Sequence, residues 1–162
     1  SKELETKTAD LFDRHGASVR VFDVPLRDYG GRCRFAGPVS TVKCFEDNTQ
    51  IKAALEEKGE GRVLVVDAGG SMRCAMLGDL IVASAVANGW SGVVLFGCVR
   101  DSAALAGMEL GVKALGTTPR KGVRRGEGQR DIAVSLGGVR VQPGDYVFCD
   151  EDGILVSDRW LA

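Results

Sequence analysis

Hydrophobic residues in this chain form short runs separated by glycine-rich turns, and their spacing changes along the sequence. In residues 49–58 the apolar side chains recur at three- and four-residue intervals, which predicts a helix with one buried face. The runs at 62–67 and 92–96 are continuously apolar, as in strands that are buried on both faces. After Thr118 the pattern changes to short segments in which apolar and polar residues alternate, which is typical of strands with one exposed face.

The complete pattern predicts four helices and a larger number of short strands. Asn48 is the candidate N-cap of the second helix, and Gly59 is the candidate end of that helix. In chain order, we expect helices at 6–16, 49–58, from about 79 and from about 102, and strands at 19–22, 34–39, 62–67, 92–96, 112–115, 132–134, 139–141, 146–148 and 154–156. This arrangement predicts an α/β fold, with a single compact domain over residues 1–162 and a mixed sheet.

Composition argues against several kinds of partner for this protein. A formal net charge of −1 argues against nucleic acid as a bulk electrostatic partner. The five cysteines include no C-x-x-C pair, which argues against a zinc site and favours a reducing, cytoplasmic location. No apolar run approaches the roughly 20 residues needed to cross a bilayer, and no signal peptide opens the chain, so we expect no membrane partner.

Three neighbouring segments carry the strongest chemical signal: Gly69-Gly70-Ser71-Met72-Arg73, Leu77-Gly78-Asp79 and Gly97-Cys98-Val99-Arg100-Asp101. A glycine-rich loop that opens a helix presents free backbone N–H groups to an anion. An Arg-Asp pair directly after a buried strand lies at the sheet edge where open α/β folds bind ligands. Together they predict a site for a small carboxylate held by amides, a guanidinium and a metal.

Each of these residues also has a purely structural interpretation. Asp101 can cap the helix that begins near Ser102, Asp79 can cap the helix that it opens, and Arg100 can form an ordinary salt bridge. The basic run at 120–130 has no interleaved aromatic residues on which bases could stack, so we expect a solvated loop or one that faces a neighbouring subunit's site. The only histidine, His15, lies far from these motifs, which argues against a Ser-His-Asp triad.

Residues 45–156 resemble the RraA-like family, which includes regulators of ribonuclease activity and divalent-metal aldolases that cleave 4-hydroxy-4-methyl-2-oxoglutarate. The motifs that carry the resemblance are Val65-Val66-Asp67-Ala68-Gly69-Gly70-Ser71, Gly78-Asp79, Gly97-Cys98-Val99-Arg100-Asp101, Leu115-Gly116-Thr117-Thr118-Pro119-Arg120-Lys121 and Pro143-Gly144-Asp145.

The resemblance implies a swivelling β/β/α, phosphohistidine-like fold and a homotrimer or a dimer of trimers. It also implies that Asp101 carries a divalent metal, Mg²⁺ or Mn²⁺, and that Arg100, Asp101 and Asp79 are catalytic. The substrate-binding residues that it implies are Gly78, Asp79, Leu80, Ile81 and Arg100. In this assignment the 78–81 run supplies amide donors, and Asp79 orients Arg100 or metal-bound water.

Three functional interpretations follow from the resemblance. The first is a divalent-metal-dependent lyase that releases pyruvate from small 2-oxo acids, either as an oxaloacetate decarboxylase or also as a weak 4-hydroxy-4-methyl-2-oxoglutarate aldolase. The resemblance implies that the family's site has two forms. In one form an aspartate precedes the Arg-Asp pair by twenty intervening residues, as Asp79 precedes Arg100 here. In the other form that aspartate is a glycine and an acid stands three positions after the pair, where this sequence has Ala104. The chain ends at Ala162 without the C-terminal extension of the fuller aldolases, which favours decarboxylation. The second function is a regulator that binds a ribonuclease or helicase without catalysis, and another carboxylate substrate in the same cleft is a third interpretation.

Overall fold

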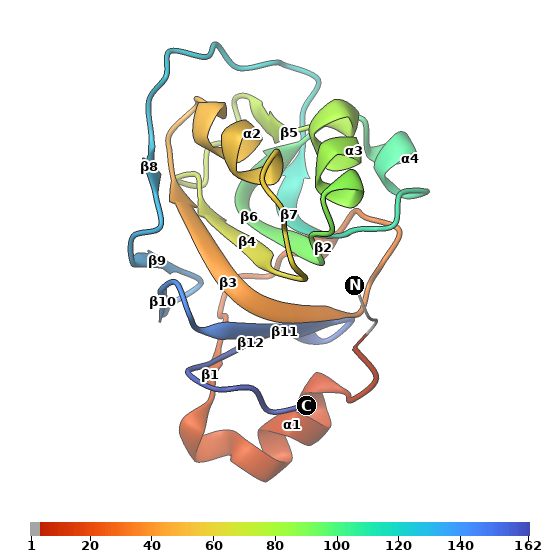
Figure 1. Ribbon diagram of the computed structural model, residues 1–162, viewed down its shortest axis with the longest axis vertical. Helices are drawn as coiled ribbons and strands as arrows, with labels where there is room; N and C mark the ends of the chain where they lie inside the picture. Colours follow the sequence, from red (N-terminus) through yellow and green to blue (C-terminus); the bar gives the residue numbers. More distant parts are fainter. Residues whose placement is uncertain (1–3) are drawn as a thin grey trace.

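The long strand β3 (Phe35–Lys43) joins two halves of one curled sheet (Figure 1). In the computed structural model, which describes residues 4–162, its first residues pair antiparallel with β11 (Tyr146–Asp150). Its last five residues, from Val39 onward, pair parallel with β4 (Val63–Asp67). One strand therefore belongs to an antiparallel half and to a parallel half, which makes the sheet mixed.

The parallel half continues from β4 to β6 (Gly92–Val99) and then to β7 (Gly111–Thr117). The short β5 (Ala75–Leu77) pairs with the end of β6, and β2 (Arg27–Asp28) closes the outer edge against β7. The helices that accompany this half are α2 (Thr49–Leu55), α3 (Asp79–Ala87) and α4 (Ser102–Leu105). Figure 1 shows α2 and α3 side by side on one face of these strands.

The antiparallel half extends from β11 to β12 (Gly153–Ser157) and β1 (Arg20–Val21). Helix α1 (Thr8–His15) and a 3₁₀ turn (Gly16–Ser18) lie at this end of the molecule, away from α2 and α3 (Figure 1). A separate hairpin is formed by β9 (Val134–Leu136) and β10 (Val139–Val141), and β8 (Gln129–Arg130) pairs with the end of β3.

Three apolar clusters hold these layers together. The largest lies between α2, α3 and α4 and the parallel strands, and it includes the fully buried Trp90. The second fills the space between the other face of the sheet and the β9–β10 hairpin, and the third lies under α1. No helix among residues 4–162 has the length and apolar character that a membrane crossing needs. All five cysteines are free thiols, and four of them are buried.

The amino ends of β6 and β7 are closed by the ring of Phe35, which is fully buried. Gly92 and Gly111 are register partners, and each lacks the side chain that would occupy the ring's position. A Cβ at Gly92 would lie 2.4 Å from the Phe35 ring, and one at Gly111 would lie 2.1 Å from it. Glycine is therefore required at both positions by the close approach of the ring.

The predicted α/β fold with a mixed sheet is confirmed. Helix α2 ends at Leu55 rather than near 58, and the strand expected at 132–134 is displaced to Val134–Leu136. Asn48 occupies the N-cap position of α2, but its side chain does not cap the helix. The carboxylate of the preceding residue, Asp47, accepts the Thr49 amide instead, at 2.9 Å.

Candidate active site

A cavity of about 320 Å³ opens at the carboxyl ends of β5 and β6, beside the first turn of α3. Its lining includes all six of the site residues that the sequence predicts: Gly78, Asp79, Leu80, Ile81, Arg100 and Asp101. The cavity lies at the carboxyl edge of the parallel strands, the edge where open α/β sheets bind ligands. The two predicted motifs, separated by twenty residues, therefore meet in one cleft.

Asp101 has the most unusual backbone in the cleft. Its φ of 57° and ψ of 37° place a non-glycine residue in the left-handed region, at the N-cap position of α4. Its side chain does not cap α4. The Oδ2 atom instead accepts a hydrogen bond from the backbone amide of Asp79, at 3.1 Å. Asp101 therefore holds the N-cap position of α4, as one interpretation of the sequence predicts, but its carboxylate faces the first turn of α3 instead of capping α4.

Gly78 makes this approach possible. A Cβ at this position would lie 2.9 Å from Asp101 Oδ2 and 3.4 Å from Arg100 Cγ. The backbone of Gly78 is extended, so the glycine is needed here for space rather than for an unusual dihedral angle. Its carbonyl accepts the amide of Val82 at 3.0 Å, which begins the hydrogen-bond ladder of α3.

The first turn of α3 supplies backbone donors to the cleft. Asp79 is the first helical residue, and Gly78 holds the N-cap position, so the interpretation of Asp79 as the N-cap is wrong. The amides of Leu80 and Ile81 belong to the first turn, where N–H groups have no acceptor within the helix. The helix dipole adds to the attraction of these groups for an anion.

Arg100 follows β6 directly, and its amide is held by the carbonyl of Leu77 at 2.9 Å. The ordinary salt bridge that sequence reasoning offered for it is absent: within residues 4–162 its guanidinium makes no ion pair. Lys121 and Arg124 line the same cavity, and neither pairs with a carboxylate in the described part of the chain. Three cations therefore face the cleft without a direct ion pair, and the carboxylates of Asp79 and Asp101 line the same cavity. The guanidinium of Arg100 and the amides of α3 make this a site that can bind an anionic ligand.

The glycine-rich loop at Gly69 and Gly70 does not contribute to this cleft, contrary to the prediction. Both glycines have positive φ, and their amides are used within the protein. The Gly69 amide donates to Asp67 Oδ1 at 2.9 Å, and the Gly70 amide donates to the carbonyl of Phe96 at 3.1 Å. The loop leads into β5 rather than into a helix, so the anion-binding amides are those of α3 alone.

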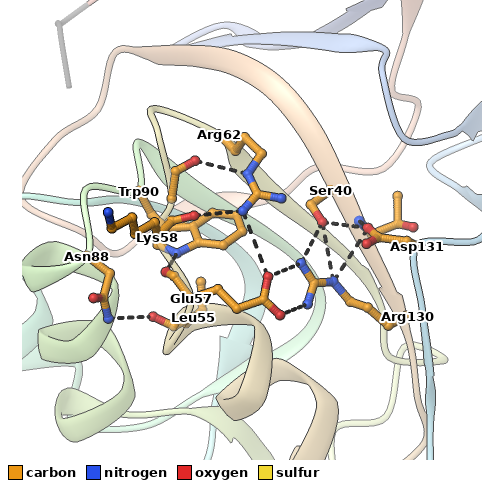
Figure 2. A network of polar contacts seen from close by, with 11 residues as sticks. Ser40, Leu55, Glu57, Lys58, Arg62, Asn88, Trp90, Arg130 and Asp131 are labelled. Atoms are coloured by element: carbon orange, nitrogen blue, oxygen red, sulfur yellow. Dashed lines mark hydrogen bonds and ion pairs between the residues drawn. The ribbon is translucent and has the colours of Figure 1, made fainter.

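The basic loop that follows β7 was interpreted from the sequence as solvated or as facing another subunit. Two of its residues, Lys121 and Arg124, instead line the cleft of their own chain. At the start of the loop, the carbonyl of Arg120 accepts the amide of Ala75 at 2.8 Å. At its end, Arg130 Nη1 donates to Glu57 Oε2 at 2.8 Å and Nη2 donates to Ser40 Oγ at 2.9 Å (Figure 2).

The middle of the basic loop is held by the buried carboxylate of Asp47. Its Oδ2 atom accepts the amides of Arg125 at 2.7 Å and Glu127 at 3.1 Å, while Oδ1 accepts the Thr49 amide and hydroxyl. Burial alone would raise the pKa of Asp47, but the hydrogen bonds from Thr49, Arg125 and Glu127 outweigh it and hold the pKa well below its ordinary value. The Asp-Asn pair before α2 is the sequence signal that could have identified this clamp.

Two aspartates of the cleft could hold a metal ion whose remaining ligands are water and substrate, rather than an ion that is coordinated by protein side chains alone. Among residues 4–162 no group of three or more His, Cys, Asp or Glu side chains is arranged to hold a metal ion. Mg²⁺, however, commonly takes one or two carboxylates and completes its shell with water and substrate. Asp101 retains Oδ1 without a hydrogen bond in the described residues, and Asp79 lines the same cavity. Two carboxylates are therefore available for such an ion.

Comparisons with known proteins show the family to which this sequence is related. Residues 8–156 match the RraA-like family, described as Aldolase/RraA. The chain is 55% identical, over 98% of its length and 99% of the relative, to a protein of Alkalilimnicola ehrlichii named "putative 4-hydroxy-4-methyl-2-oxoglutarate aldolase".

Two solved structures share the fold across nearly the whole chain. One, from Thermus thermophilis, is described as the RNA-processing inhibitor RraA and is 41% identical, with a TM-score of 0.92 over 96% of this chain and 94% of its own. The other, from Geobacillus kaustophilus, is described as an S-adenosylmethionine:2-dimethylmenaquinone methyltransferase and is 46% identical, with a TM-score of 0.95 over 96% of this chain and 97% of its own.

Proposed function

This chain belongs to the RraA-like family, and from its cleft we propose that it is a divalent-metal-dependent lyase that cleaves small 2-oxo acids and releases pyruvate. The observation that carries the proposal is the meeting of the Asp101 carboxylate, the Arg100 guanidinium and the α3 amides on one cavity. The names of the curated relatives support an aldolase. Oxaloacetate decarboxylation is the first reaction to test, because it requires the fewest groups from the protein.

Asp101, with Asp79 beside it, is the residue that would hold Mg²⁺ or Mn²⁺. When bound there, such an ion supplies Lewis-acid polarisation of the substrate's keto group. The amide of Asp79 keeps the Asp101 carboxylate turned into the cleft through a bond of 3.1 Å. The left-handed backbone at Asp101 directs the side chain away from α4, where it would otherwise serve as a cap.

Arg100 and the α3 amides would bind the substrate's own oxygens. A guanidinium binds a carboxylate through two parallel hydrogen bonds, which fixes the position of the 2-oxo acid as well as its charge. The amides of Leu80 and Ile81 offer further donors at the positive end of the α3 dipole. In a cleft these donors are arranged before the substrate arrives, so they stabilise developing negative charge without reorganisation.

Cleavage of oxaloacetate breaks the bond between C3 and C4. The electron pair of that bond moves toward the keto oxygen and leaves pyruvate enolate, while C4 departs as carbon dioxide. Arg100 stabilises the negative charge that develops on the enolate oxygen, and a proton taken up at C3 completes pyruvate. Retro-aldol cleavage differs because a base must also remove the hydroxyl proton of the substrate.

The test is pyruvate release from oxaloacetate in the presence of Mg²⁺, with and without EDTA. Because free divalent ions speed this reaction, a blank with metal and no protein is subtracted. Asp101→Ala is compared with Asp13→Ala, which removes an exposed aspartate from α1 at the opposite end of the molecule (Figure 1). We expect EDTA and Asp101→Ala to abolish the protein-dependent rate and Asp13→Ala to retain it. A native rate equal to the blank would exclude the decarboxylase.

A second candidate function is regulation of a ribonuclease by surface binding. The observation that favours it is the 41% identity and close structural similarity to the RNA-processing inhibitor of Thermus thermophilis. Under this function the interaction would not depend on the cleft. Binding to a ribonuclease that persists in Asp101→Ala, together with the absence of turnover, would support regulation over catalysis.

A further inference from the structure

A second hollow, of about 260 Å³, adjoins the cleft at a place where three loops meet. The first loop joins β3 to α2, the second joins β4 to β5, and the third is the basic loop that follows β7. The charged residues of its lining are Glu46, Arg73, Arg120, Lys121 and Arg125. The three loops therefore gather four cationic side chains around one carboxylate, although the whole chain has a net charge of −1.

Two of these cations have no counter-ion within the protein. In residues 4–162 neither Arg120 nor Lys121 forms a salt bridge, and both residues are exposed. Arg125 pairs with Glu127 at 3.6 Å, but both side chains are more than half exposed, and an ion pair of that kind is weak. Positive charge that the protein does not neutralise favours a negatively charged ligand at this surface.

The loops that form the hollow are fixed to one another. Glu46 has a left-handed backbone, with φ 55°, and its Oε2 atom accepts Ser71 Oγ and Arg73 Nε, both at 2.6 Å. Gly122 brings the basic loop against this pair of loops. A Cβ at Gly122 would lie 3.2 Å from the Glu46 carbonyl oxygen and 3.4 Å from Cys74 Sγ. A surface that is ordered before its ligand arrives loses little conformational freedom on binding.

Exposed apolar side chains border the cations. Val123 lines the hollow and is 68% exposed, and Phe45, which is 53% exposed, lies beside Arg73. The Arg73 guanidinium covers the ring of Phe45 at 5.6 Å from its centroid, so a nucleic-acid base could stack on that face only by displacing the guanidinium. Single-stranded nucleic acids bind proteins through such stacking. The combination of cations and apolar side chains therefore favours a peptide over a nucleic acid.

We propose that this hollow is a docking site for an acidic segment of another protein. An apolar side chain of the segment contacts Val123 and Phe45, and carboxylates on either side of it pair with Arg120 and Arg125. A guanidinium and a carboxylate match in two parallel hydrogen bonds, which gives such pairs a defined geometry. The docking site goes beyond the proposed lyase function, because of its described lining residues only Lys121 also lines the cleft.

The test determines the chemistry of the bound segment without assuming its sequence. Short random peptides displayed on phage are selected on the native protein and, in parallel, on Arg120→Glu. We expect the native protein, and not the variant, to enrich peptides in which Asp or Glu flanks a large apolar residue. An enriched peptide is then synthesised with a fluorescent label and titrated by anisotropy. Its affinity should fall as the salt concentration rises, because salt screens exposed charges.

Four variants show where the labelled peptide binds. Arg120→Glu should weaken it by about tenfold or more, because repulsion replaces attraction. Val123→Ser should weaken it without changing the salt dependence, because no charge is removed. Arg100→Met, in the cleft, should leave the affinity unchanged. The matched control is Arg14→Glu, the same charge reversal on an exposed residue of α1, which lies at the end of the molecule opposite the loop between β7 and β8 (Figure 1).

Selection that enriches no peptide, or peptides without an excess of acidic residues, would overturn the proposal. Equal affinity in Arg120→Glu, or an equal loss in Arg14→Glu, would also overturn it. A uridine oligonucleotide is titrated in the same assay, and tighter binding of it than of the peptide, lost in Arg120→Glu, would show a nucleic-acid site instead. Sedimentation in which Arg120→Glu dissociates an oligomer of the native chain would place a second copy on this surface.

The docking site and the lyase fail separately. If the protein releases pyruvate but enriches no acidic peptide, the docking site is wrong and the lyase stands. If it releases no pyruvate but binds an acidic peptide through Arg120 and Val123, the lyase is wrong and the docking site stands.

Discussion

Replacement of Gly78 by alanine is expected to displace the Asp101 carboxylate from the first turn of α3 while the protein remains folded. The backbone at Gly78 has φ −139° and ψ −170°, which any residue can adopt. A Cβ there would lie 2.9 Å from Asp101 Oδ2, closer than real Cβ atoms approach an oxygen. Because the atom it meets is the end of a side chain, the carboxylate can turn away while the backbone remains in place.

The size of the effect follows from the bond that is lost. Asp101 Oδ2 would leave the Asp79 amide, and a hydrogen bond to a charged group contributes about 1.5–3 kcal/mol. That corresponds to a loss of roughly 10- to 150-fold in metal affinity or turnover. A glycine-to-alanine change at a compatible backbone also stabilises the fold by about 0.4–1 kcal/mol through the unfolded state. Together these two effects should lower the free energy of unfolding of Gly78→Ala by about 0.5–2.6 kcal/mol, so the variant should remain folded.

Three measurements test this expectation: Mn²⁺ titration followed by electron paramagnetic resonance, oxaloacetate turnover and urea unfolding. The control is Gly107→Ala, where the nearest atom to the added Cβ is the carbonyl oxygen of Ala104 at 3.8 Å. The control should match the native protein in Mn²⁺ affinity and turnover. If Gly78→Ala keeps native metal affinity and turnover, the position of the Asp101 carboxylate does not govern the site, and the reasoning fails.

Three further predictions concern the fold. Asp47→Asn should lower the free energy of unfolding by about 2–3 kcal/mol in urea, because the neutral amide cannot accept all the donors that the carboxylate accepts. Because the pKa of Asp47 is lower in the folded state than in the unfolded state, the carboxylate contributes its full stabilisation of the folded protein above about pH 4 and loses it as the pH falls below that value. The free energy of unfolding of Asp47→Asn should therefore decrease less than that of the native protein between pH 5 and pH 2. Gly111→Ala should lower the free energy of unfolding by about 1–3 kcal/mol, since the added Cβ would lie 2.1 Å from the Phe35 ring. Thermal or urea unfolding measures this change, and an unchanged midpoint would contradict the tight packing described for that ring. Burial raises the pKa of the Cys33 and Cys44 thiols to about 12. At pH 8 both thiols should therefore react slowly with iodoacetamide in the native protein and rapidly after unfolding, as measured by mass spectrometry. Rapid modification of the two thiols in the folded protein would contradict this prediction.

Much of the fold was predictable because the parallel strands are continuous apolar runs bounded by clear turns. The strands that were missed, β2, β5 and β8, have two or three residues each, too few for any periodicity to register. They exist because longer neighbours offer free edges: β5 pairs with the end of β6, and β8 pairs with the end of β3. Such pairing depends on tertiary context rather than on the local sequence.

The candidate site was predictable where its residues follow regular elements. Arg100 and Asp101 directly follow β6 and Asp79 opens α3, so the topology brings them to one edge of the sheet. The contribution of Arg124 was not predictable in this way. Its place depends on a buried carboxylate at Asp47, more than seventy residues earlier in the chain, and no sequence spacing reports that contact. The prediction that the loop at Gly69 binds an anion failed for a similar reason, because its amides donate to acceptors within the protein that only the folded structure shows.

The ring of Phe35 and the cleft lie at opposite ends of the same parallel strands. Gly92 and Gly111 begin β6 and β7 at the end that the ring closes, while Arg100 follows β6 at the other end. Positions 35, 92 and 111 should therefore change in concert during evolution, since a larger residue at either glycine needs a smaller one at 35. The residues of the cleft are under no such constraint from the ring. Descendants of this fold can consequently acquire new substrates through the loops at one end while the packing at the other end is inherited intact.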